Sequence, residues 1–134
     1  MRVKKLCIID DDDLYKLLLK KSIKNLGNNV DILTYSNGEE ALLGLSAFKD
    51  SPDLLPDLIL LDINMPIMDG WEFMEKFVDV KKHLKKSITI FIASSSIAKQ
   101  DLEKSKSFNE ISGYIVKPIL KDTVANLLIS KKAL

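Results

Sequence analysis

Charged and hydroxyl-bearing side chains stand directly after several short apolar runs in this sequence. They are Asp10 and Asp11, Asp62, the serines Ser94, Ser95 and Ser96, and Lys117. If the apolar runs are strands of one parallel sheet, these side chains meet beyond the carboxyl ends of the strands, where open α/β sheets bind their ligands. Carboxylates, hydroxyls and an ammonium group would then share one rim of the molecule.

This combination of groups suits phosphoryl transfer. Carboxylates packed together repel one another, and they stay ionised together only when a cation joins them. Mg²⁺ binds one or two carboxylates together with phosphate oxygens, while a lysine and a hydroxyl can contact the remaining phosphoryl charge. An aspartate carboxylate is also a known type of phosphoryl-accepting nucleophile. The residue types therefore favour Mg²⁺-dependent phosphoryl chemistry.

The elements that must position these groups alternate between apolar runs and amphipathic stretches. We expect strands at 6–9, 30–35, 58–61, 88–93 and 113–116. We expect helices at 14–26, after Asn37-Gly38, from Asp69-Gly70 to about residue 82, at 97–108 and at 121–132. Such alternation predicts an α/β fold, and the best candidate is a flavodoxin-like (βα)5 doubly wound parallel sheet with strand order 2-1-3-4-5.

Length and composition limit the remaining classes of function. The chain has 134 residues, which suits one domain, and its net charge of +1 gives no general attraction to nucleic acid or membranes. A single cysteine, Cys7, excludes an intrachain disulfide and fits the cytoplasm. Because no apolar run approaches the roughly 20 residues that span a bilayer, we expect no membrane insertion and a cytoplasmic location.

Four features of the sequence together resemble a known family. They are Ile8-Ile9-Asp10-Asp11, the stretch Leu61-Asp62-Ile63-Asn64-Met65-Pro66-Ile67-Met68-Asp69-Gly70, a hydroxyl after the fourth strand, and Tyr114-Ile115-Val116-Lys117-Pro118. In this order they resemble the CheY-like receiver domain of two-component response regulators, over nearly the whole chain. The resemblance implies a single receiver (response regulatory) domain at 1–134.

The resemblance also implies roles for individual residues at the rim. Asp62 would be the phosphoacceptor, and Lys117 would contact the phosphoryl oxygens. Asp11 would bind Mg²⁺ directly and Asp10 through water, together with Asp62 and the backbone carbonyl of Asn64. The domain would then phosphorylate and dephosphorylate itself without being a turnover enzyme.

Two further residues would form the conformational switch of such a domain. Ser94 would be the switch hydroxyl, with Ser95 as the alternative, and Tyr114 would be the aromatic side chain that turns inward. The Lys117–Pro118 bond is often cis in the family. The interval between the hydroxyl and Lys117 is slightly long, which suggests an altered loop around 109–112.

The first helix carries more apolar surface than one core stripe requires, so part of it must face outward or widen the core face. We hypothesise that this surface forms a docking patch for the phosphodonor. Its candidate residues are Leu14, Tyr15, Leu18, Pro118 and Ile119. The donor would be a sensor histidine kinase or a histidine phosphotransfer protein, and the output would be contact with an unidentified protein target.

Two other functions compete with this interpretation. A Mg²⁺-dependent phosphatase with an aspartyl intermediate would need an acid two residues after its nucleophile, where this chain has Asn64. A phospho-independent interaction module would not need Asp10, Asp11, Asp62 and Lys117 together. Direct nucleic-acid binding is not expected, because nothing after Ile119 resembles a helix-turn-helix.

Overall fold

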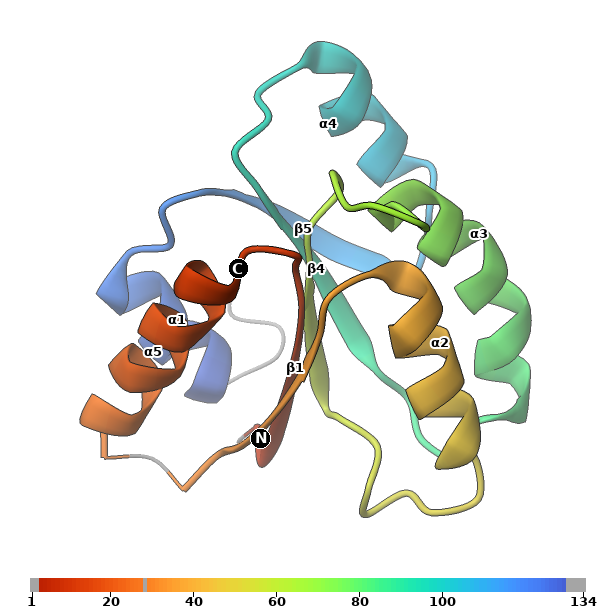
Figure 1. The fold of residues 1–134 in the computed structure, drawn as a ribbon, viewed down its shortest axis with the longest axis horizontal. Coiled ribbons are helices and arrows are strands. Elements are labelled where there is room, and N and C mark those ends of the chain that lie inside the picture. The colour runs from red at the N-terminus through yellow and green to blue at the C-terminus, as the bar shows by residue number, and fades with distance from the viewer. Residues whose placement is uncertain (1–2, 28, 130–134) are drawn as a thin grey trace.

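Strands and helices alternate along the chain in the computed structural model, which describes residues 3–27 and 29–129 (Figure 1). The strands are β1 (Lys5–Ile9), β2 (Asp31–Tyr35), β3 (Leu58–Leu61), β4 (Thr89–Ser94) and β5 (Ile111–Val116). The helices are α1 (Asp13–Asn25), α2 (Gly38–Ala47), α3 (Gly70–Val80), α4 (Lys99–Lys106) and α5 (Lys121–Ile129), with a short 3-10 helix at Lys81–His83. This element order confirms the predicted (βα)5 pattern.

The strands form one parallel sheet in the order β2-β1-β3-β4-β5, as predicted. Strand β1 lies inside the sheet and pairs on both sides, so that Ile9 lies opposite Tyr35 of β2 and Leu61 of β3. Because β1 and β3 are neighbours and end at the same level, the residues that follow them are placed side by side at one edge of the sheet.

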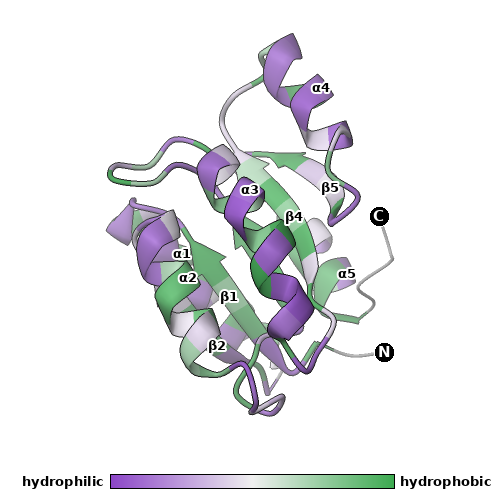
Figure 2. Ribbon diagram, turned by 90° about the vertical axis from the view of Figure 1, so that its right-hand side faces the viewer, coloured by the Kyte–Doolittle hydropathy of each residue, from purple (hydrophilic) through white to green (hydrophobic). Residues whose placement is uncertain are grey.

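Helices cover both faces of the sheet and create two apolar cores. Along β1, Leu6 and Ile8 face the core that α1 and α5 close, whereas Cys7 and Ile9 face the core beneath α2 and α3. Figure 1 shows the resulting layers, with α1 and α5 on one side of the sheet and α2 and α3 on the other, and Figure 2 shows hydrophobic strands and helices that carry many hydrophilic residues. Burial on both faces explains why the strands read as continuous apolar runs.

Polar side chains start the helices close to the ends of the strands. Asp12 caps α1 by accepting the Tyr15 amide, and Asp69 caps α3 through a reciprocal capping box with Glu72. Gly27 follows α1 with a φ of 75°, a left-handed conformation that glycine adopts without strain. These caps explain why α1 and α3 begin immediately behind the rim of the sheet.

The structure corrects several predicted boundaries. Strand β5 begins at Ile111, earlier than expected, and a bulge at Ser112 interrupts its pairing with β4 between Ile90 and Phe91. The expected altered loop at 109–112 is therefore a turn at 109–110 followed by the bulged start of the strand. Helix α4 is shorter than expected, because the backbone of its N-cap Ala98 is extended. Residues 130–132 of the last predicted helix lie outside the described residues.

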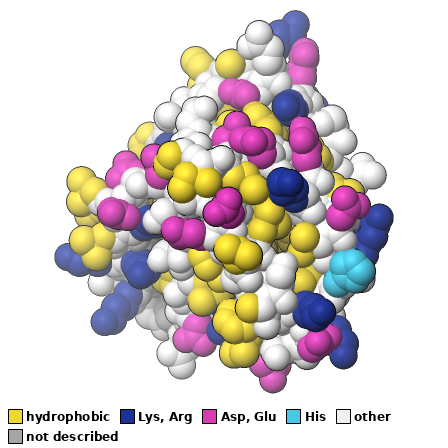
Figure 3. Space-filling view, turned by 45° about the vertical axis from the view of Figure 1, so that its right-hand side comes forward, with side chains coloured by type: hydrophobic (Ala, Val, Ile, Leu, Met, Phe, Trp, Pro, Cys, Tyr) yellow, Lys and Arg dark blue, Asp and Glu magenta, His cyan; other side chains and the backbone are white. Residues whose placement is uncertain are grey.

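The basic run at 81–86 lies at the opposite edge of the sheet from the rim, and its lysines are paired with acids. Lys82 lies 3.6 Å from Asp79, Lys85 lies 3.5 Å from Asp50, Lys86 lies 2.8 Å from Asp57, and Lys81 contacts Glu110. His83 is exposed among these charged side chains (Figure 3). In the described part of the chain, no helix has the length and apolar character needed to cross a membrane.

Candidate functional site

Three carboxylates meet where β1 and β3 end. Asp10 and Asp11 follow β1, Asp62 follows β3, and one oxygen from each carboxylate lies within 4.8 Å of the other two. Asp10 and Asp62 are buried, whereas Asp11 is exposed, so the cluster is reachable from solvent on one side. Oxygen ligands at this spacing match what a hard divalent cation such as Mg²⁺ requires.

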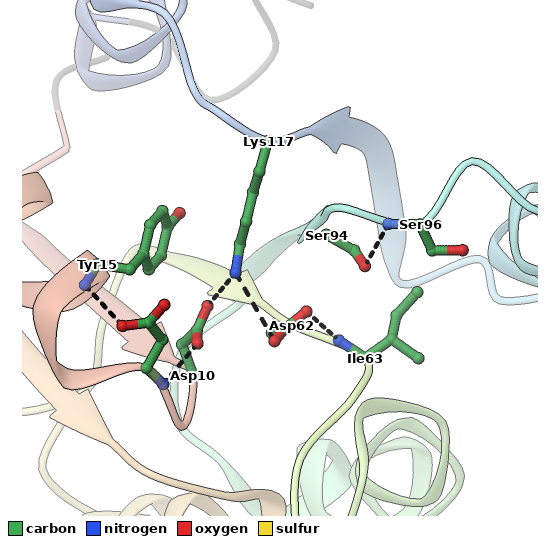
Figure 4. A network of polar contacts seen from close by, with 8 residues as sticks. Asp10, Tyr15, Asp62, Ile63, Ser94, Ser96 and Lys117 are labelled. Carbon is green, nitrogen blue, oxygen red and sulfur yellow. Dashed lines mark hydrogen bonds and ion pairs between the residues drawn. The ribbon is translucent and has the colours of Figure 1, made fainter.

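Lys117 extends from the end of β5 into this cluster. Its Nζ lies 2.5 Å from the Asp10 carboxylate and 3.7 Å from the Asp62 carboxylate (Figure 4). The Lys117 amide donates to the carbonyl of Ser94 at 2.9 Å, and the Lys117–Pro118 peptide bond is cis. The lysine thus brings a positive charge from a distant strand to the predicted phosphoacceptor.

The electrostatic environment of Asp62 opposes its ionisation. Burial and then the neighbouring Asp10 carboxylate raise the pKa of Asp62 above its ordinary value. Lys117 and the Ile63 amide, which donates to Asp62 at 2.8 Å, offset this effect only in part. An additional cation between the carboxylates would relieve their repulsion, because it favours the charged form of each.

Local sequence determines how the chain turns after Asp62. The Gly70 amide donates to the Ile63 carbonyl at 2.8 Å, and a Cβ on Gly70 would lie 2.3 Å from the Asp62 carbonyl oxygen. Only glycine permits this close approach, which explains the Asp69-Gly70 pair in the motif. Asn64 lies within the same turn and is exposed.

The three serines after β4 occupy different environments. Ser94 is fully buried at the end of β4, and its Oγ accepts the Ser96 amide at 3.2 Å. Ser95 is exposed. Of the two candidates for the switch hydroxyl, Ser94 is therefore the one that the strand holds inside the site beside Asp62 (Figure 4).

A hydrogen-bonded chain connects the end of β4 to α3 and α4. The Tyr114 hydroxyl donates to the Ser96 carbonyl at 2.9 Å, and the Ser96 hydroxyl donates to Asp101 at 2.6 Å. The Trp71 indole donates to the other Asp101 oxygen at 3.1 Å. Sequence reasoning missed the roles of Ser96 and Asp101, because these partners come from separate elements and share no local pattern.

The candidate docking residues divide into exposed and packed side chains. Leu14 and Leu18 are exposed by 65% and 53%, and Pro118 is also exposed. Tyr15 and Ile119 instead pack against the core beneath α1 and α5. Two residues outside the predicted set, Leu17 and Leu120, add exposed apolar surface.

Comparison with known proteins agrees with this architecture. The chain is 32% identical to the probable transcriptional regulator ycf29 of Porphyra purpurea, over 92% of this chain and 54% of that protein. It is 29% identical to chemotaxis protein CheY of Listeria monocytogenes, over 92% of this chain and 94% of that protein. The chain thus spans about half the length of the first relative and nearly all of the second.

Solved structures and a family model lead to the same assignment. A two-component response regulator from Cytophaga hutchinsonii superimposes with a TM-score of 0.81 and 26% identity, over 95% of both chains. The family model described as the response regulator receiver domain matches residues 6–129. The chain belongs to the CheY-like receiver domain family of two-component response regulators.

Proposed function

We propose that this receiver domain accepts a phosphoryl group on Asp62 and signals through the resulting change in conformation. The observation that carries this proposal is the meeting of Asp62 with Asp10, Asp11 and Lys117 at one edge of the sheet. Three acids beside one lysine leave the site short of positive charge, and phosphoryl transfer needs that charge to be supplied.

The missing charge would come from Mg²⁺. Asp10, Asp11 and Asp62, with the backbone carbonyl of Asn64, would hold the ion, and the spacing of the three carboxylates supports this ligand set. When bound, the ion would neutralise negative charge on the phosphoryl oxygens. Asp11 is the exposed ligand, so the ion can enter from solvent without opening the core.

The protein's own groups account for the rest of the transfer. A carboxylate oxygen of Asp62 forms the new bond to phosphorus, and the donor's bond to phosphorus breaks with its electron pair leaving on the donor group. Lys117, 3.7 Å from Asp62, contacts the phosphoryl oxygens. Small donors such as acetyl phosphate would suffice for self-phosphorylation, and water would later release the phosphate. The domain would act as a switch rather than as a turnover enzyme.

The switch would begin at Ser94. Its Oγ accepts the Ser96 amide, which leaves the hydroxyl proton free to be donated to a phosphoryl oxygen on Asp62. Ser96 also holds Tyr114 and Asp101, so a shift at Ser94 would pass to the surface formed by α4, β5 and α5. Phosphorylation would then change the populations of two arrangements of that surface.

The phosphodonor would be a sensor histidine kinase or a histidine phosphotransfer protein that docks on α1. The exposed apolar side chains of Leu14 and Leu18, with Pro118, supply the contact surface beside the acidic rim, and Tyr15 and Ile119 support it from the core. The output would be binding to a downstream protein in the cytoplasm, without direct nucleic-acid contact or membrane insertion.

The test is a mass measurement after incubation with acetyl phosphate and Mg²⁺. We expect the intact protein to gain the mass of one phosphoryl group, and the gain to disappear in Asp62→Asn and after chelation of Mg²⁺. An adduct of equal yield in Asp62→Asn would contradict the proposal. So would the lack of both an adduct and beryllofluoride binding at every Mg²⁺ concentration, which would favour a phospho-independent interaction module.

A further inference from the structure

Lys117 needs a contact that survives metal binding. Its flexible four-carbon stem can point the ammonium in many directions, and its shortest contact in this structure is the Asp10 carboxylate at 2.5 Å. Asp10 is also one of the three carboxylates that would hold the cation. A cation beside Asp10 would weaken the attraction of that carboxylate for the Lys117 ammonium, so a second contact would be needed to keep the lysine oriented in the metal-loaded protein.

The ring of Tyr15 supplies a second contact to Lys117. The Lys117 Nζ lies 4.1 Å from the ring centroid, well within the range in which an ammonium is attracted to an aromatic face. Figure 4 shows Tyr15 and Asp62 on opposite sides of the Lys117 amine, with the ring projecting from the first turn of α1. An aromatic face does not bind Mg²⁺ in place of a carboxylate, so this contact does not compete with the metal.

The hydroxyl of Tyr15 has no comparable role. It is buried and finds no hydrogen-bond partner among the described residues. The rest of the side chain packs with the core beneath α1 and α5, which fixes the position of the ring. The geometry thus assigns the contact with Lys117 to the ring alone.

We propose that Tyr15 is a positioning residue whose ring holds the Lys117 ammonium toward Asp62, so that the lysine meets the phosphoryl group when a cation near Asp10 weakens the Lys117–Asp10 pair. The inference rests on the proposed function, since it assigns Tyr15 a part in the same site. It assigns Tyr15 to the orientation of Lys117 inside the site, and not to the surface that contacts a partner protein. The simpler alternative is that Tyr15 only fills the core.

Binding of beryllofluoride, which mimics a phosphoryl group on a carboxylate, separates these alternatives. We expect Tyr15→Leu and Tyr15→Met to weaken beryllofluoride binding at saturating Mg²⁺ by about tenfold, because both lose the aromatic face. Binding of Mg²⁺ alone, measured by calorimetry, should change by less than about twofold, since the metal ligands remain. Tyr15→Phe should behave as the wild type in both titrations, because it keeps the ring.

A second readout needs no metal or phosphoryl mimic. The ε-methylene protons of Lys117 should show an upfield ring-current shift in the NMR spectrum of the metal-free wild type and of Tyr15→Phe, and should lose it in Tyr15→Leu. Tyr35→Leu is the matched control, because Tyr35 is a partly buried tyrosine that packs against the other core. It should leave the Lys117 shift in place.

Three results would overturn the proposal. Beryllofluoride could bind Tyr15→Leu as tightly as the wild type, Tyr15→Phe could be as weak as Tyr15→Leu, or binding of Mg²⁺ alone could fall in parallel with beryllofluoride binding. A wild-type protein that binds no beryllofluoride at Asp62 would instead count against the phosphoacceptor. In that case the NMR shift would still decide whether Tyr15 holds Lys117.

Discussion

Asp62 and the residues around it combine burial, like charge and a single opposing lysine. Burial and the Asp10 carboxylate raise the pKa of Asp62, and Lys117 offsets part of that rise. The types of these residues were predictable, because each follows an apolar run in the sequence. The inward position of Tyr15 was not predictable from the sequence. Helical spacing alone cannot distinguish a side chain that faces a partner protein from one that contacts a lysine inside the site.

Ile67 carries backbone strain in the turn after Asp62. Its φ of 68° lies in the left-handed region, which a β-branched side chain rarely adopts, and its side chain is 74% exposed. We expect Ile67→Asn to raise the free energy of unfolding by roughly 1 kcal/mol, because asparagine tolerates this conformation better. Urea denaturation measures the change.

The control for this variant is Ile97→Asn. Ile97 is 75% exposed, and its φ is not among the positive values in the described chain. The substitution Ile97→Asn should therefore leave the free energy of unfolding nearly unchanged. If the two variants shift stability by the same amount, the gain at Ile67 comes from lost surface hydrophobicity and not from relieved strain.

At the scale of elements, side chains of α3 and of the segment after β4 contact α4 and the residues that follow it. The Trp71 ring of α3 stacks on Phe108 with centroids 6.2 Å apart, and the Lys104 ammonium lies 5.5 Å from the Trp71 centroid. Asp101 adds the hydrogen bonds to Trp71 and Ser96. These contacts link α4 to the residues after β4, in the part of the fold that is proposed to move.

Removal of the Asp101 carboxylate should loosen α4. We expect Asp101→Ala to lower the free energy of unfolding by about 1–2 kcal/mol, because it leaves the Trp71 indole donor without its partner. The emission of Trp71, the only tryptophan in the chain, should change in the native state. Glu103→Ala is the matched control on the same helix, since Glu103 is exposed and its pair with Lys99, at 3.8 Å, contributes little to stability. Equal effects of the two variants would contradict the role of Asp101.

The apolar surface of α1 allows a test of partner docking. We expect Leu14→Asp to slow phosphotransfer from a histidine phosphotransfer protein by roughly tenfold or more, because it places a charge in an apolar contact. Phosphorylation by acetyl phosphate should keep its rate. Leu43→Asp is the control, as Leu43 is 67% exposed on α2 at the other face of the sheet. Equal slowing with both donors would argue against docking at Leu14.

For the whole molecule, the sequence predicted the class of fold, the strand order and the meeting of Asp10, Asp11, Asp62 and Lys117. The alternation of apolar runs and amphipathic stretches indicates the elements, and right-handed crossovers limit the topologies to a few, of which the order 2-1-3-4-5 was the best candidate. The bulge at Ser112, the short α4 and the Asp101 hydrogen bonds depend on contacts between distant elements. Such contacts leave no periodic trace in the sequence.

Asp57 shows how a distant contact holds the opposite edge of the sheet together. Its carboxylate accepts the amides of Lys4 and Lys5 at 2.8 and 3.0 Å, and it pairs with Lys86 at 2.8 Å. Burial alone would raise the pKa of Asp57, but the Lys86 contact and the two amides outweigh burial and lower it. One side chain thus joins the start of β1, the start of β3 and the segment before β4.

The lowered pKa of Asp57 predicts the pH dependence of stability. Because its pKa is lower in the folded than in the unfolded chain, the ionised carboxylate stabilises the fold above about pH 4, and this contribution is lost as the pH falls through the folded value. We expect Asp57→Asn to lower the free energy of unfolding by about 1–3 kcal/mol at neutral pH. The difference from the wild type should shrink in acid.

Urea denaturation across this pH range measures the effect, with Asp53→Asn as the control. Asp53 is exposed in the loop before β3. Its variant should match the wild type at every pH. A difference between Asp57→Asn and the wild type that stays constant from neutral pH into acid would show that the carboxylate charge is not what stabilises this edge.

The central claim is that the phosphoryl group is carried by the carboxylate of residue 62 and by no other acid at the rim. Borohydride reduction of the phosphorylated protein, followed by proteolysis and peptide sequencing by mass spectrometry, identifies the acyl phosphate directly, because hydride converts that aspartate to homoserine with release of phosphate. We predict homoserine at position 62 alone, with Asp10 and Asp11 unchanged. Homoserine at position 10 or 11 in place of 62 would contradict the account.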